Sequence, residues 1–138
     1  EGVLYAEYKI GGDSTDSYEI ITLRNGNSEI VGIGKQNSSN NIFIRLTIGS
    51  VDVFNNLEVS PIDGYNKVAI SYKSGNSSAW VNGTKAYSSS STFTPSPTIG
   101  RLSFQWDTPS TFNFYGKTKD LQVFNYALTD EELQTLTT

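Results

Sequence analysis

Apolar and polar side chains alternate along most of the chain, which is the pattern of a β-strand with one buried face. The clearest example is residues 41–49. The positions predicted to face inward are Ile42, Ile44, Leu46 and Ile48. The positions predicted to face outward are Phe43, Arg45 and Thr47. This segment is therefore predicted to be a strand that lies against a hydrophobic core.

The same alternation predicts further strands along the whole chain: within 2–10, 18–35, 51–59, 66–87, 98–106 and 115–126. Turn signals separate them, and the strongest are Asn25-Gly26 and Asn82-Gly83, because both residue types tolerate positive φ. Roughly ten short strands with turns between them, and no interior helix, predict an all-β antiparallel sandwich.

The chain ends on one helix signal. Thr129 followed by Glu132 fits a capping box, and Asp130 to Glu132 place negative charge where a helix dipole is positive. A helix this short is unstable alone. It is therefore predicted to pack on the sandwich, as a plug over an open edge or a sheet end.

Composition limits the function classes. The chain has 138 residues, which fits one domain (1–138), and it contains no Cys and no His. The absence of both residues argues against disulfides, zinc sites and His-dependent catalytic triads. A net charge of −4 argues against a nucleic-acid partner. No apolar run reaches the ~20 residues of a membrane span. Met is also absent, even at position 1, which suggests a piece cut from a longer protein or processed at its start.

Three segments carry a resemblance to a known family: AWVNGTKA (79–86), RLSF (101–104) and FYGKTKDLQVFNYALTDEELQTL (114–136). They resemble the laminin-G-like branch of the concanavalin-A-like lectin/glucanase superfamily. The family's ending motif is matched by Gly116, Asp120, Leu121, Val123, Phe124, Asn125, Ala127, Leu128, Thr129 and Glu132. Thr118 departs from it, because the family has an apolar residue there. The segment 114–136 also looks like modules of phage tail fibres and of bacterial polysaccharide-binding proteins.

This resemblance implies a curved jelly-roll sandwich whose concave face or rim loops hold a sugar. The function expected from it is a non-catalytic, lectin-like adhesion module that binds a glycan and belongs to a larger extracellular or virion protein. The alternative is a structural or protein-interaction domain, for example in a phage tail fibre. Glucanases of this superfamily carry Glu-x-Asp-x-x-Glu on one strand, and no such run occurs here. We therefore expect no enzymatic activity.

Sugar sites combine aromatic faces that stack on pyranose rings with polar groups that bond hydroxyls. Trp106, Asp107 and Tyr115 flank one polar loop and form the first candidate site. Two interpretations of Trp106 remain, because it either forms a wall of this site or continues the inward parity of Leu102 and Phe104. Tyr115 is likewise either a second wall or part of the sheet packing.

A second candidate surface follows from strand parity. Arg45 and Lys73 are predicted to be donors on outward faces, beside a shallow groove left by the small residues Ala69, Ser71 and Ala79. The two cations would suit an acidic polysaccharide, and the alternative is an ordinary solvated face. Trp80 is expected to be a core residue.

No cofactor is required by this interpretation. Some members of the resembled family carry a structural Ca²⁺, and Asp120 matches an acidic position of the family motif. A Ca²⁺ ligand is one interpretation of Asp120, and a hydrogen bond at a turn or strand edge is the other.

Overall fold

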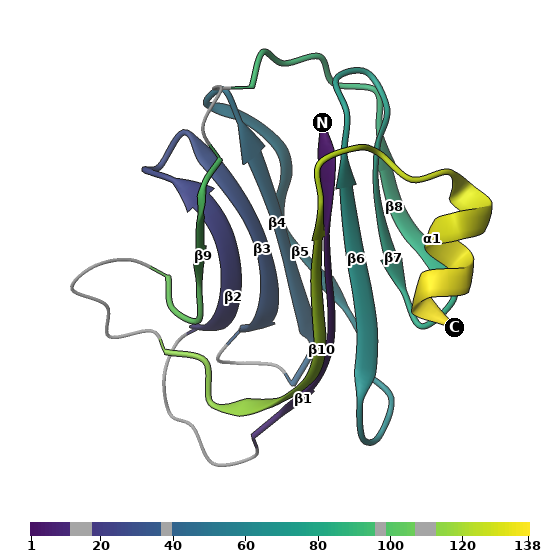
Figure 1. The fold of residues 1–138 in the computed structure, drawn as a ribbon. Helices are drawn as coiled ribbons and strands as arrows, with labels where there is room; N and C mark the ends of the chain where they lie inside the picture. Colours follow the sequence, from purple (N-terminus) through teal and green to yellow (C-terminus); the bar gives the residue numbers. More distant parts are fainter. Residues whose placement is uncertain (12–17, 37–39, 96–98, 107–112) are drawn as a thin grey trace.

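A computed structural model describes residues 1–11, 18–36, 40–95, 99–106 and 113–138 as two packed antiparallel sheets (Figure 1). The strands are β1 (Gly2–Ile10), β2 (Tyr18–Asn25), β3 (Glu29–Gln36), β4 (Ile42–Ile48), β5 (Val51–Val59), β6 (Asn66–Tyr72), β7 (Ser77–Val81), β8 (Thr84–Ser89), β9 (Arg101–Ser103) and β10 (Gly116–Phe124). Sheet A has the order β10-β1-β6-β7-β8, and sheet B has the order β5-β4-β3-β2-β9. The predicted all-β antiparallel sandwich is confirmed.

The predicted turns lie where the sequence puts them. Gly26 follows β2 with φ of 59°, and the side chain of Arg24 folds back to donate to the Gly26 carbonyl oxygen. Asn82 and Gly83 connect β7 to β8 with φ of 49° and 78°. Two successive positive φ values are those of a tight hairpin turn, which matches the right-handed twist of the strands it joins.

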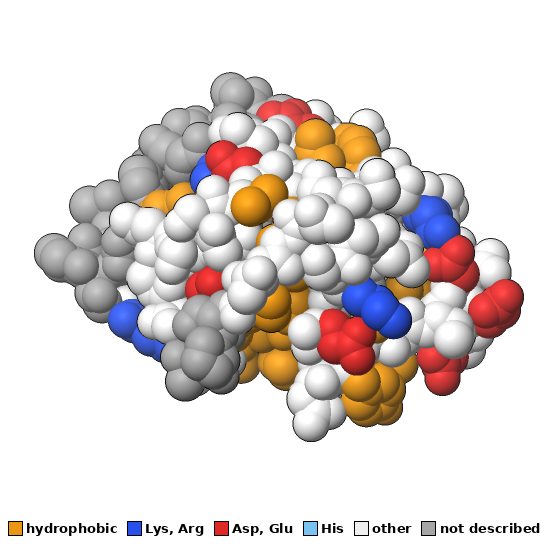
Figure 2. Space-filling model, turned by 90° about the horizontal axis from the view of Figure 1, so that it is seen from above, with side chains coloured by type: hydrophobic (Ala, Val, Ile, Leu, Met, Phe, Trp, Pro, Cys, Tyr) orange, Lys and Arg blue, Asp and Glu red, His pale blue; other side chains and the backbone are white. Residues whose placement is uncertain are grey.

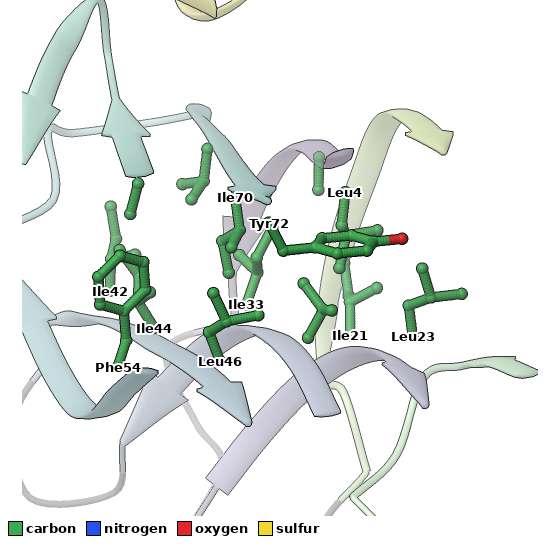
Figure 3. Packing of buried hydrophobic residues seen from close by; sticks show 14 of the residues in the cluster. Leu4, Ile21, Leu23, Ile33, Ile42, Ile44, Leu46, Phe54, Ile70 and Tyr72 are labelled. Atoms are coloured by element: carbon green, nitrogen blue, oxygen red, sulfur yellow. The ribbon is translucent and has the colours of Figure 1, made fainter. Parts of the chain in front are cut away.

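The core lies between the two sheets and is built from alternate residues of nearly every strand. Figure 3 shows Ile21, Leu23, Ile33 and Leu46 of sheet B facing Leu4, Ile70 and Tyr72 of sheet A. The four residues of the 41–49 segment that were predicted to face inward are all fully buried here. The parity prediction for the inner face of this segment, β4, is therefore confirmed.

Side chains close the two long sides of the sandwich, where sheet edges face one another. On one side, the Tyr87 hydroxyl of β8 donates to the Glu58 carbonyl oxygen of β5 at 2.6 Å. On the other side, the Phe114 ring contacts the rings of Tyr8 and Phe104, with 5.9 Å between centroids in each case. On this second side, the backbone N–H of Phe114 also donates to the Phe104 carbonyl oxygen at 2.8 Å, so both side-chain and backbone contacts hold the edges together.

The predicted strand at 98–106 is mostly absent. β9 contains three residues, and beyond it only an isolated bridge pairs Gln105 with Asn113, while residues 96–98 lie outside the described part of the chain. The Thr22 hydroxyl donates to the Gln105 carbonyl oxygen at 3.0 Å. In the described part of the chain, the ladder between β2 and β9 ends at the pair Thr22–Ser103, and beyond it this side-chain hydrogen bond links the chain to sheet B.

The helix α1 (Asp130–Thr137) covers the outer face of sheet A, against β6, β7 and β8 (Figure 1). Leu133 is 1% exposed and packs with Val3, Tyr5, Ala69 and Trp80 in a second apolar cluster. The expectation of a plug over an edge or sheet end is therefore wrong. Three outward side chains of β1 and β6, those of Val3, Tyr5 and Ala69, are themselves apolar, and burying them requires a layer on the face rather than at the rim.

The predicted capping box is present. The Thr129 hydroxyl accepts from the Glu132 backbone N–H, and the Glu132 carboxylate accepts from the Thr129 backbone N–H. At the other end of α1, the Thr137 hydroxyl accepts from the backbone N–H of Gly83 at 3.3 Å. Trp80, expected to be a core residue, is 6% exposed beneath the helix.

Phe43 was expected to face solvent, and this expectation is wrong. It points away from the main core but is fully buried, as is Ile20 two strands away on the same face of sheet B. The chain after β9 bends over this face, as the bond between Thr22 and Gln105 shows. The outer face of sheet B is consequently a partly covered surface, and only part of it is open to solvent.

Candidate functional site

A row of residues in register crosses the outer face of sheet B. Ser103 of β9 pairs with Thr22 of β2, Thr22 pairs with Gly32 of β3, and Gly32 pairs with Arg45 of β4. Gly32 has no side chain, and a Cβ there would lie 2.8 Å from Cδ1 of Ile20 and 3.7 Å from Cβ of Arg45. The space above Gly32 is therefore occupied by the side chain of Ile20, and Arg45 lies directly beside it on β4.

A β-bulge continues this row onto β5. Ile44 pairs with Leu57 and Leu46 pairs with Phe54, so the single residue Arg45 faces the two residues Asn55 and Asn56. Asn56 takes the left-handed conformation with φ of 53°, which Asn adopts more readily than most residues. Bulges of this kind redirect side chains. Here the bulge brings two carboxamides to one guanidinium.

The guanidinium of Arg45 organises the polar side chains around it. Nε donates to the Thr47 hydroxyl at 3.2 Å, and Nη1 donates to Oδ1 of both Asn55 and Asn56 at 3.2 Å. Nη2 donates to Oδ1 of Asp52 at 3.3 Å and forms an ion pair with it. Thr47 also donates to Asp52, at 2.7 Å. We call these five residues the Arg45 cluster: Arg45, Thr47, Asp52, Asn55 and Asn56.

Trp106 completes this arrangement. It lies beyond the end of β9, is half-buried, and its ring centre is 5.6 Å from the guanidinium carbon of Arg45. That distance is within the range of a cation–π contact. Of the two interpretations of Trp106, the structure disfavours a core position that continues the parity of Leu102 and Phe104, since those residues are 42% and 45% exposed. The predicted partner Asp107 lies outside the described residues.

The predicted groove with Arg45 and Lys73 as joint donors does not exist. Arg45 is on sheet B, whereas Lys73 follows β6 at the end of sheet A and pairs with Glu1 at 3.7 Å. Ala69 is buried under α1, and Ala79 faces the main core. Strand parity alone could not reveal the error, because it says which residues share a face of one strand but not which strands share a sheet.

Tyr115 stays a separate candidate. Its side chain is 52% exposed just before β10, and its backbone oxygen accepts from the Gly11 N–H at 2.8 Å. Within the described residues its ring contacts no other ring. The structure therefore brings together Arg45 and Trp106 among the predicted residues, and not Tyr115 or Lys73.

Asp120 lies on the outer side of sheet A, directly opposite Glu7 of β1. Its carboxylate accepts from the Gln122 amide at 2.7 Å. Glu7 accepts from Lys119 at 2.8 Å, and this hydrogen bond, followed by the charge of Glu7, raises the pKa of Lys119. The structure's described ranges contain no group of three or more carboxylates that could hold a metal. These surroundings do not fit a Ca²⁺ ion, which prefers six to eight oxygen ligands. A Ca²⁺ ion bound by Asp120 therefore stays a prediction. The groups around Asp120 in the structure do not support it.

The sequence interpretation missed the other members of the Arg45 cluster. The signal that could have found them is the pair Asn55-Asn56 within the predicted strand 51–59, since Asn is depleted in strands. Two adjacent Asn residues indicate a bulge or turn there. Asp52 and Thr47 become recognisable only once the pairing of β4 with β5 is known.

The fold is an antiparallel sandwich of the jelly-roll type. The chain belongs to the concanavalin A-like lectin/glucanases superfamily, whose sequence model matches residues 6–134. A comparison with curated proteins found no match. No helix in the described part of the chain has the length and apolar content needed to cross a bilayer.

Several solved structures share the fold. One is the CBM40 of the Ruminococcus gnavus IT-sialidase bound to α2,3-sialyllactose, with TM-score 0.64 and 16% identity over 99% of this chain and 82% of that one. Another is domain 4 of AbnA, an extracellular arabinanase of Geobacillus stearothermophilus, in complex with arabinotriose, with TM-score 0.67 and 15% identity over 100% and 66% of the two chains. A third is a heptameric SAP-like pentraxin from Limulus polyphemus, with TM-score 0.58 and 14% identity over 99% and 69%.

Proposed function

We propose that this chain is a non-catalytic carbohydrate-binding module, and that the Arg45 cluster together with Trp106 forms its binding surface. The observation that carries the proposal is the contact between Arg45 and Trp106, which places an aromatic ring beside a set of oriented polar groups. Aromatic rings stack on the C–H faces of sugars, and carboxamides and carboxylates bond their hydroxyls. The sugar-bound relatives of the same fold support this function.

The proposed module is non-catalytic because the carboxylates in and near the Arg45 cluster do not form the pair that a glycosidase needs. A glycosidase needs two carboxylates about 5–10 Å apart, on either side of the scissile bond. Asp52 is the carboxylate of the Arg45 cluster, and it is held by Arg45 and Thr47. Glu58, further along β5, accepts from the Asn41 amide at 2.8 Å. Each of these groups is engaged as a hydrogen-bond acceptor, which suits a binding role.

As a binding module, the chain would act as the adhesion part of a larger extracellular or virion protein and would contact that protein's other domains. One of the relatives with this fold is a domain of an extracellular enzyme, which supports an extracellular location.

A second candidate, a structural or protein-interaction domain, is favoured by a different observation. Apolar side chains are exposed where the β9 and β10 edges meet: Leu102, Phe104, Tyr115 and Val123 are 42%, 45%, 52% and 48% exposed. Figure 2, seen from above the view of Figure 1, shows hydrophobic side chains that reach the surface at several places on this face. A hollow of about 390 Å³ lies on this side, lined in part by Leu23, Tyr72 and Ile99. Such a surface suits contact with another protein.

Glycan-array binding followed by calorimetry separates the two candidates. We expect the wild-type chain to bind one or more oligosaccharides, and Trp106→Ala to weaken that binding at least about tenfold while the circular dichroism spectrum is unchanged. Tyr126→Ala is the matched control, because Tyr126 is an exposed aromatic residue whose ring contacts Phe124 of β10 on the other sheet. A folded chain that binds no glycan but associates with itself or with a neighbouring domain would contradict the proposal.

A further inference from the structure

We infer that the Arg45 cluster selects neutral sugars and discriminates against anionic ones, because Arg45 acts as an internal scaffold rather than as a receptor for a negative charge. This inference rests on the proposed binding function, and it names the class of sugar. It departs from the expectation that a surface arginine indicates an acidic polysaccharide.

The hydrogen-bonding capacity of Arg45 is nearly used up within the protein. A guanidinium has five N–H groups, and it binds a carboxylate through two parallel ones. In Arg45, Nη1 faces the two oxygens of Asn55 and Asn56, Nε faces Thr47, and Nη2 faces Asp52. Four of the five N–H groups therefore have internal acceptors. No adjacent pair is left for the two-pronged contact that a sugar carboxylate needs.

The charge of Arg45 is balanced as well. Its ion pair with Asp52 joins side chains that are 20% and 45% exposed, so the carboxylate is the more accessible of the two charges. For an anionic sugar that approaches the cluster, the more accessible charge is therefore the carboxylate of Asp52, which repels it. The chain as a whole carries a net charge of −4, which adds to this repulsion.

The groups that remain for a ligand are suited to hydroxyls. A guanidinium can only donate, so the atoms of Asn55 and Asn56 that face Arg45 must be their oxygens. Their NH₂ groups are consequently directed elsewhere, on two exposed side chains. In Asp52, Oδ1 accepts from both Arg45 and Thr47, which leaves Oδ2 as an acceptor.

Two carboxamide donors and one carboxylate acceptor thus lie on the same strand, β5, at its bulge and just before it. A sugar hydroxyl both donates and accepts, and adjacent hydroxyls on one ring can satisfy such a mixed set at once. A carboxylate can only accept, so it would leave the Asp52 oxygen facing another negative charge. The cluster is therefore complementary to a neutral diol.

The test compares matched neutral and anionic probes on the same protein. Lactose is compared with sialyllactose, which contains the same lactose core, on an array of neutral and acidic oligosaccharides and then by calorimetry. We expect the neutral sugars that bind to do so at least tenfold more tightly than their anionic counterparts. We also expect their affinity to be insensitive to NaCl between 50 and 500 mM, since no net charge is exchanged.

Asp52→Asn probes the charge balance directly. It should weaken neutral-sugar binding at least tenfold through loss of the acceptor, and it should raise the affinity for the anionic probe by exposing the charge of Arg45. Asp63→Asn is the matched control, because Asp63 is an exposed carboxylate in the loop between β5 and β6. Urea unfolding of each variant confirms that it is folded.

Three contradicting outcomes can be told apart. Salt-sensitive binding of an anionic sugar that disappears in Arg45→Ala would overturn the neutral selectivity while supporting a sugar site at this cluster. A folded chain that binds neither class of probe would overturn the carbohydrate-binding function itself. Neutral binding that is unchanged in Asp52→Asn would show that the acceptor role assigned to Asp52 is wrong.

Discussion

The guanidinium carbon of Arg45 lies 5.6 Å from the centre of the Trp106 ring, and this contact joins the middle of β4 to the chain beyond β9. Both residues stand out as candidates in the sequence, but for different surfaces. The fold brings them together because β9, β2, β3 and β4 are successive neighbours in sheet B, and the chain that leaves β9 reaches Arg45 of β4.

The geometry of Arg45 should matter more than its charge. Lysine keeps the charge but presents its three donors from one atom, so it cannot hold Thr47, Asp52 and the two Asn side chains together. We expect Arg45→Lys to weaken glycan binding by about tenfold or more, which is the cost of one or two hydrogen bonds to a charged group. Calorimetry measures this. Arg101→Lys on the exposed edge strand is the control, and equal affinities for Arg45→Lys and wild type would show that charge alone is sufficient.

The docking of α1 should contribute strongly to stability. Leu133 is 1% exposed among Val3, Tyr5 and Trp80, so Leu133→Ala leaves a cavity against sheet A. We expect a loss of about 2–4 kcal/mol in the free energy of unfolding, measured by urea denaturation. Gln134→Ala, on the exposed side of the same helix, should change stability by less than about 0.5 kcal/mol. Similar values for the two variants would contradict the packing of α1.

Stability should fall at alkaline pH through Tyr5. Burial, followed by the negative charges of Glu7 and Asp120, raises the pKa of Tyr5 from 10.0 to about 12. A folded-state pKa above the unfolded value contributes stability that is present below pH 10 and is lost as the pH rises toward 12. Tyr8 and Tyr72 also have raised pKa values because they are buried.

The measurement is urea denaturation of the wild type and Tyr5→Phe at several pH values between about 8 and 11.5. The variant should lose less stability over this interval, because phenylalanine has no proton to release. Parallel pH profiles for the two proteins would show that Tyr5 ionises as freely in the folded chain as in the unfolded one.

Gly49 should not tolerate a side chain. Its φ is 57°, and a Cβ there would lie 2.5 Å from the backbone oxygen of Thr94. We expect Gly49→Ala to lower the free energy of unfolding by at least about 1–3 kcal/mol, through backbone strain and displacement of that segment. Gly100→Ala is the control, because a Cβ there meets no atom within 4 Å. A fully stable Gly49→Ala would mean that the turn between β4 and β5 can rearrange without cost.

Local signals in the sequence were sufficient for strands, turns and the helix cap. Strand parity is a property of one segment, so Ile42 and Ile44 could be assigned to the core without knowing any partner strand. The capping box is likewise local, because Thr129 and Glu132 are one turn apart. The strand predicted at 98–106 is shortened to Arg101–Ser103, and beyond it the Gln105 carbonyl oxygen accepts from the hydroxyl of Thr22, a residue far away in the sequence.

The sequence by itself therefore determined the fold class, the inner face of β4 and the capped ending, since each follows from side-chain spacing along the chain. The tertiary structure alone decided that Phe43 is buried, that α1 covers a face and that Arg45 and Lys73 are on different sheets. It also decided the composition of the Arg45 cluster, through a bulge that sets two residues of β5 against one of β4. The physical reason is that sheet order and register depend on interactions between segments far apart in the chain, and these leave no periodic signal in any one of them.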